Sequence, residues 1–92
     1  MREHRKFYID GQWVDPVEPR DCEVIDPSTE EPCAVISLGG ADDTTAAVAA
    51  ARRALPAWAE TPPAERIAYI EKMAEIYERR IDEMAEVISM EM

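Results

Sequence analysis

The chain has 92 residues, with 20 acidic and 10 basic side chains and a formal net charge of −10. A chain of this length forms one small domain at most, and its negative charge opposes binding to nucleic acid phosphates or anionic lipids. The apolar stretch near the N-terminus, residues 7–9, is far too short for a signal peptide or a membrane-spanning helix, so we expect a cytoplasmic protein without nucleic acid or membrane partners.

Residues 6–38 are predicted to form two β-hairpins. In the first, the apolar and aromatic segments 7–9 and 12–14 flank Asp10-Gly11. This dipeptide is typical of a type I′ turn, which needs positive φ angles. The residues before this hairpin, including the lone His4, are expected to be frayed and solvated.

The second predicted hairpin pairs residues 22–26 with residues 32–38, and residues 27–30 turn the chain. Cys22 and Cys33 lie in these strands. A disulfide between neighbouring strands is geometrically feasible, but nothing else in the composition indicates an oxidising compartment, so we expect two free thiols. No further Cys or His completes a four-ligand metal set around them.

A helix is predicted over residues 41–59. Gly39-Gly40 ends the preceding strand, and Asp42 and Asp43 place carboxylates at the positive end of the helix dipole. Pro56 is expected to kink or end this helix. Its predicted buried face consists of Val48, Ala51, Leu55 and Trp58.

Residues 62–92 are predicted to form one long amphipathic helix. Its apolar stripe consists of Ile67, Ile70, Ala74, Tyr77, Ile81, Met84 and Ile88, widened by Met73, Ile76 and Val87. Its acidic side, which includes Glu71, Glu75, Glu78, Asp82 and Glu86, is expected to be a solvated face. Because no capping Gly or Asn follows and no basic residue lies in the last turn, we expect the helix to continue beyond Met92.

The sequence contains no motif that identifies a catalytic or cofactor-binding residue. The three glycines form no Gly-x-Gly-x-x-Gly loop, so no cofactor-binding residue is assigned. His4 has no acid or nucleophile fixed near it in the sequence, so no catalytic residue is assigned either.

The order of these segments resembles the N-terminus of the aldehyde dehydrogenase superfamily over nearly the whole chain, from Phe7 to Met92. The resemblance rests on residues 7–14 (FYIDGQWV), residues 24–31 (VIDPSTEE), residues 48–54 (VAAARRA) with Trp58, and Glu65-Arg66 at the start of the long helix. Members of that family usually carry glycine where this chain has Glu30. A left-handed Glu30 would carry a strain of roughly 1 kcal/mol, unless the turn adopts another type.

The resemblance implies an α+β segment of two β-hairpins and two helices, the second long, within the Rossmann-like α/β cofactor-domain region of the enzyme. It also implies a parent enzyme that oxidises aldehydes to carboxylic acids with NAD or NADP through a cysteine nucleophile. The nucleophile, the general base and the cofactor site would all lie after Met92, so residues 1–92 alone would be inactive and bind no cofactor. Some members bind a monovalent cation through backbone carbonyls that correspond here to Val24 and Ile25.

Three functions follow as alternatives. The first is the N-terminal segment of an aldehyde dehydrogenase, whose partner is the remainder of the parent enzyme. In that case the uncovered apolar surface around Met73, Ile76, Tyr77 and Ile81 should make the isolated chain self-associate. The second is a stand-alone acidic interaction module that pairs through the same stripe. The third, redox sensing, has only Cys22 and Cys33 in its favour.

Overall fold

The chain forms five short strands followed by three helices, so the predicted α+β class is confirmed. The computed structural model describes all residues, 1–92. In chain order the elements are β1 (Arg2–His4), β2 (Phe7–Ile9), β3 (Gln12–Val14), β4 (Asp21–Asp26), β5 (Glu31–Ser37), α1 (Ala41–Ala59), α2 (Pro63–Arg79) and α3 (Ile81–Glu91).

The predicted first hairpin is the antiparallel pair β2–β3. Asp10 and Gly11 have φ angles of 55° and 75°, the left-handed values that a type I′ turn needs. Tyr8 and Trp13 are directly opposed across the two strands, with ring centroids 5.2 Å apart. Such cross-strand aromatic pairs stabilise a short hairpin that has few hydrogen bonds of its own.

The second predicted hairpin is β4–β5, and it belongs to a three-stranded sheet of order β1-β5-β4. The sequence predicted that residues 2–4 are frayed, and this prediction was wrong. These residues form β1, which pairs in parallel with β5. At the turn, Glu30 has a φ of 61°, and its N–H donates to the carbonyl of Asp26 at 2.8 Å. Glu30 thus keeps the left-handed geometry and the strain that accompanies it.

Helix α1 begins after Gly40, and it continues through Pro56 rather than ending there. Its buried residues are Asp43 and Ala50, not the predicted face. Val48 and Leu55 are each 54% exposed and Trp58 is 46% exposed, so this prediction was wrong within these 92 residues. The physical reason is that α1 packs mainly against β2, and its one aromatic contact with α2, between Trp58 and Tyr69 at 5.8 Å, leaves Trp58 half-exposed.

The predicted long helix is divided in two at Arg80, whose φ and ψ of −113° and 15° are not helical. The Arg80 N–H donates to the carbonyl of Tyr77 at 3.0 Å, which tightens the end of α2, and the Arg80 carbonyl accepts from Met84 at 3.1 Å to begin α3. The Arg80 guanidinium also donates to both carboxylate oxygens of Glu83 at 2.8 and 3.0 Å. The prediction of one continuous helix was therefore wrong at this residue.

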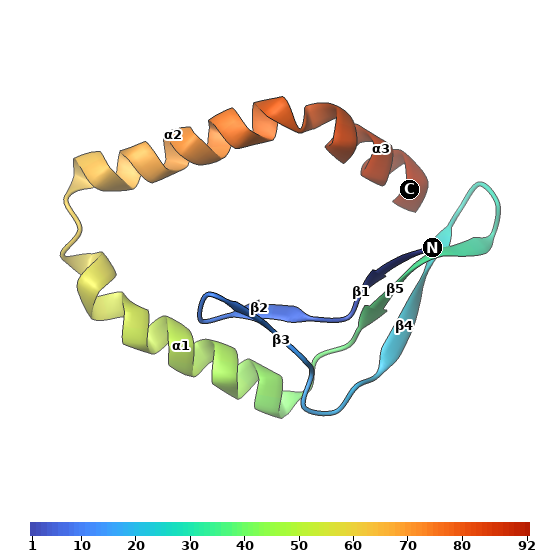
Figure 1. Cartoon of the computed structure of the whole chain (residues 1–92), viewed down its shortest axis with the longest axis horizontal. Coiled ribbons are helices and arrows are strands. Elements are labelled where there is room, and N and C mark those ends of the chain that lie inside the picture. The colour runs from blue at the N-terminus through green and yellow to red at the C-terminus, as the bar shows by residue number, and fades with distance from the viewer.

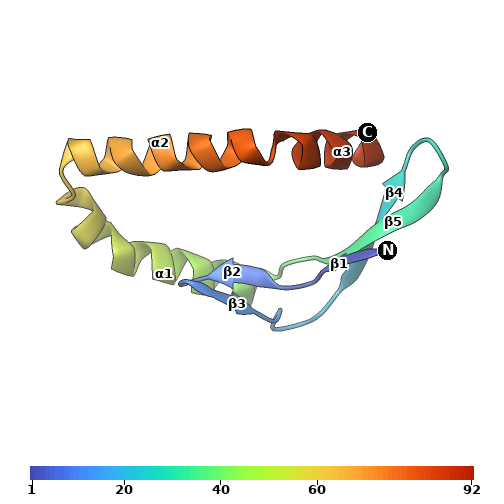
Figure 2. The same cartoon turned by 45° about the horizontal axis from the view of Figure 1, so that its top comes forward.

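The arrangement leaves the chain open. Figures 1 and 2 show α2 and α3 returning along the far side of an open frame from α1, with α3 ending near the β4–β5 hairpin. The radius of gyration is 17.0 Å, against about 12 Å for a compact domain of this length. Only 6 of the 92 residues are buried, so the chain has almost no hydrophobic core of its own.

Candidate functional site

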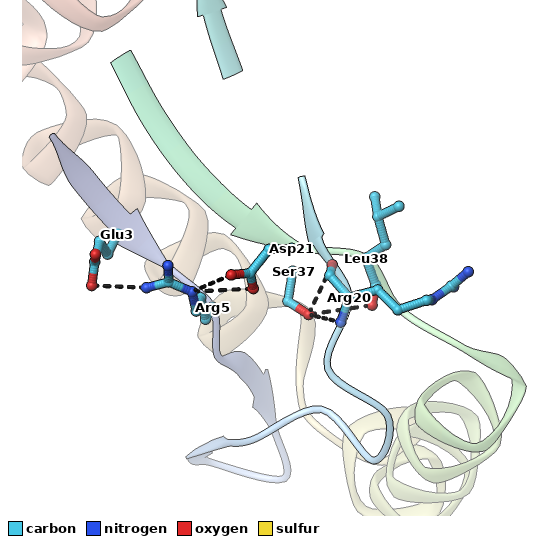
Figure 3. A network of polar contacts seen from close by, with 6 residues as sticks. All are labelled: Glu3, Arg5, Arg20, Asp21, Ser37 and Leu38. Carbon is cyan, nitrogen blue, oxygen red and sulfur yellow. Dashed lines mark hydrogen bonds and ion pairs between the residues drawn. The ribbon is translucent and has the colours of Figure 1, made fainter. Parts of the chain in front are cut away.

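Two groups of polar contacts join the sheet to its neighbours (Figure 3). In the first, the Arg5 guanidinium lies 2.8 Å from Glu3 and donates to both carboxylate oxygens of Asp21 at 3.1 and 3.2 Å. The hydrogen bonds to Glu3 and Asp21 raise the pKa of Arg5. All three side chains are well exposed, so this group ties strand ends together at the surface and forms no reactive site.

The second group centres on the buried hydroxyl of Ser37, at the end of β5. The N–H of Arg20 donates to this hydroxyl at 3.3 Å, and the hydroxyl lies 3.4 Å from the carbonyls of both Arg20 and Leu38. The Arg20 guanidinium donates to the carbonyl of Gly39 at 2.8 Å. These bonds satisfy backbone groups where β5 turns into α1, so they position the helix.

The three side chains with possible nucleophilic or basic chemistry lie in the three-stranded sheet. His4 and Cys22 both align with Ile36, one from β1 and the other from β4, so they are two strands apart, or about 10 Å. Both cysteines are free thiols, as predicted. The thiol of Cys22 contacts the carbonyl of Glu23 at 3.7 Å, and no hydrogen bond joins it to His4. The structure does not bring these groups together as a nucleophile and its base.

The backbone of Val24 and Ile25 has a distinct local geometry. The register of β4 against β5 shifts between these two residues, and Ile25 is aligned with Pro32, which has no N–H to donate. The carbonyl of Val24 accepts from the thiol of Cys33 at 3.3 Å. No group of three or more His, Cys, Asp or Glu side chains lies near enough together to hold a metal ion.

A further surface feature is the apolar side of α2 and α3. Large apolar side chains along these helices are 37–63% exposed, namely Ile67, Tyr69, Ile70, Met73, Ile76, Tyr77, Ile81, Met84 and Ile88. At the break between the helices, a hollow of about 230 Å³ is lined by Ile76, Tyr77, Arg80, Glu83, Met84 and Val87. No helix of the chain has the length and apolar character needed to cross a membrane.

The extent of this exposure can be expressed as an area. The chain exposes 7565 Å², whereas a compact protein of the same mass exposes about 5,400 Å². The excess of about 2,200 Å² is larger than the roughly 800 Å² that one partner contributes to a standard protein–protein interface. The chain therefore exposes a large surface of the kind that proteins bury in interfaces. Its His and Cys side chains are not arranged as a nucleophile and its base.

Comparison with known proteins explains this geometry. The model of the aldehyde dehydrogenase family matches residues 13–92. The chain belongs to this family. All 92 residues align, at 45% identity, with a 3-succinoylsemialdehyde-pyridine dehydrogenase of a Pseudomonas species. A betaine aldehyde dehydrogenase of Bacillus subtilis is 35% identical over 87 residues, which are 92% of this chain and 18% of that enzyme.

The same relation holds in three dimensions. The whole chain superposes on 19% of the crystal structure of an aldehyde dehydrogenase from Bartonella henselae, with a TM-score of 0.98 and 55% sequence identity. The chain likewise spans 19% of the Pseudomonas dehydrogenase. The chain thus spans about a fifth of the length of the aldehyde dehydrogenases that it matches.

Sequence reasoning missed two residues that organise the fold of this aldehyde dehydrogenase segment. Asp43 was read only as a charge at the helix start, although its position three residues after Gly40 fits one half of a capping box. Arg80 carries no proline or glycine signal, and the apolar pattern stays in phase across it, so its break between α2 and α3 had no sequence signature.

Proposed function

We propose that the chain is the N-terminal structural segment of an NAD- or NADP-dependent aldehyde dehydrogenase, which oxidises an aldehyde to a carboxylic acid. The observation that carries this proposal is the superposition of the entire chain on a fifth of a solved aldehyde dehydrogenase at 55% identity. The excess exposed surface supports it, because the remainder of such an enzyme supplies a partner for that area.

The residues of this segment do not fit a dinucleotide cofactor by themselves. Gly39 and Gly40 join β5 to α1 and belong to no glycine-rich phosphate loop. The first turn of α1 carries Asp42 and Asp43, whose negative charges oppose a pyrophosphate at that helix end. We therefore assign cofactor binding and all chemical steps to the remainder of the parent enzyme and expect residues 1–92 alone to be inactive.

The direct test is to express residues 1–92 alone and, separately, the complete reading frame that encodes them. Reduction of NAD and of NADP is then measured with a panel of aldehydes, because the named relatives act on different aldehydes. Activity is expected only from a longer product, and it should be lost when the cysteine that aligns with the family nucleophile is replaced by alanine. A longer product without aldehyde-dependent reduction of either cofactor would refute the proposed activity.

We further propose a cytoplasmic, oligomeric parent enzyme that binds a monovalent cation through the carbonyls of Val24 and Ile25. Two free thiols support a reducing compartment.

The position of Pro32 opposite Ile25 supports the cation site, because proline donates no hydrogen bond to a neighbouring carbonyl. Melting temperatures of the parent enzyme in potassium, sodium and tetramethylammonium chloride test this site, which is refuted if the three salts give the same value.

A stand-alone acidic interaction module is the second candidate, and the exposed apolar side of α2 and α3 favours it. It predicts that residues 1–92 are a complete product and form a stable complex without any dehydrogenase polypeptide. A reading frame that ends after Met92 would support it, and a continuous frame with dehydrogenase activity would exclude it.

A further inference from the structure

Asp43 is the charged residue that the fold buries, since its exposed fraction is 8%. Its two carboxylate oxygens accept from two different segments of backbone. One oxygen accepts from the N–H of Val17 at 3.0 Å, and the other accepts from the N–H of Gly40 at 2.9 Å. Val17 is 26 residues away, in the loop between β3 and β4, whereas Gly40 immediately precedes α1. No ion pair within 4.0 Å balances this carboxylate, so the two backbone N–H groups stabilise its charge.

Few other contacts hold α1 in place. The other hydrogen bond from α1 to the residues before Gly40 joins Arg53 to Asp10, in the β2–β3 turn, at 3.2 Å, and both of these side chains are exposed. Among the strands, α1 packs mainly against β2, and Ala50 is the one apolar residue of the helix that is buried. At its other end, Trp58 contacts Tyr69 of α2. The bond between Asp43 and Val17 is therefore the one part-buried polar link between α1 and the residues before Gly40.

We propose that the carboxylate of Asp43 is a clasp that couples the β3–β4 loop to the first turn of α1, and that it holds this joint only while it is ionised. An ionised carboxylate accepts from both N–H groups, whereas a protonated one carries an O–H that has to displace one of them. Hydrogen bonds to a charged acceptor are also stronger than those to a neutral one. Loss of the charge should thus free the loop from the helix.

The electrostatic surroundings agree with this role. The hydrogen bond from Gly40, followed by that from Val17, lowers the pKa of Asp43, and Arg20 lowers it further. The other charged groups around this joint are Asp10, Asp15, Glu18, Asp42 and Arg53. Because the pKa is lower in the folded chain, the clasp stabilises the joint at neutral pH, and this contribution is lost as the pH falls below the ordinary range of an aspartate.

The test is nuclear magnetic resonance of the 92-residue chain, with Asp42→Asn as the matched control for Asp43→Asn. Asp42 is the exposed neighbour in the same helical turn, so its replacement removes the same charge without touching the clasp. In Asp43→Asn, amide hydrogen exchange at Val17 should accelerate about tenfold or more, while the control leaves it unchanged. In the unsubstituted chain, the Asp43 carboxyl carbon should titrate below the ordinary pH range of an aspartate.

Either of two results would overturn the inference. The first is unchanged exchange at Val17 in folded Asp43→Asn. The second is titration of Asp43 within the ordinary pH range of an aspartate in the unsubstituted chain, a result that does not depend on whether the variant folds. The parent enzyme's activity does not enter this test, so the clasp and the proposed dehydrogenase function can fail independently.

Discussion

Replacement of Tyr77 by glutamate tests whether the apolar side of α2 drives the isolated chain to associate. Tyr77 is 51% exposed. A fully buried tyrosine removes roughly 200 Å² from water, so about 100 Å² of Tyr77 remains for a partner. At about 25 cal/mol per Å², burial of that area contributes about 2.5 kcal/mol for each copy. Tyr77→Glu removes this contribution from both copies of a dimer, about 5 kcal/mol in total, and adds a charge, so the association constant should fall about 1,000-fold or more.

Sedimentation velocity over a concentration series measures this change directly. Ala68→Glu is the matched control, because Ala68 is exposed and lies nine residues from Tyr77, which places it on the opposite side of the helix. It adds the same charge and should leave association nearly unchanged. A wild-type chain that stays monomeric at every concentration would refute the reasoning. Equal weakening by the two variants would also refute it, because net charge alone would then explain the effect.

Three further substitutions test other parts of the fold. Val35→Ala removes a side chain that is 5% exposed and should lower the free energy of unfolding by about 2 kcal/mol in urea titrations, whereas Val17→Ala, at 61% exposure, should change it by less than about 0.5 kcal/mol. Glu30→Gly should raise that free energy by up to about 1 kcal/mol because it relieves the left-handed φ of 61°. Glu30→Ala keeps the strain, so an equal gain from both would contradict this reason. Arg80→Ala should raise the pKa of Glu83, because the Arg80 hydrogen bonds now lower it. An unchanged carboxyl titration of Glu83 would show that this ion pair does not persist in solution.

Some features of the candidate site could be predicted from the sequence, and others could not. The sequence correctly indicated that both cysteines are free thiols. It also identified the residues that carry the exposed apolar side of α2 and α3, because helical periodicity places them on one face. It did not identify the contact of Asp43 with Val17, because a hydrogen bond between segments 26 residues apart leaves no pattern in either segment.

By itself, the sequence determined the local features of this protein. Asp10-Gly11 makes a type I′ turn because these residues tolerate positive φ, and Gly39-Gly40 separates strand from helix because glycine disfavours both. The order of the motifs also sufficed to indicate the family. Such local features depend on the backbone preferences of adjacent residues, so they can be predicted without knowing the tertiary structure.

Only the tertiary structure decided how those elements meet. It placed β1 beside β5, divided the long helix at Arg80, and left Val48, Leu55 and Trp58 about half-exposed. Periodicity shows that a face is apolar, but burial depends on a second surface, which residues 1–92 do not supply for α1 or α2. The 92 residues therefore specify the arrangement of these elements, whereas the apolar side of α2 and α3 stays exposed within them.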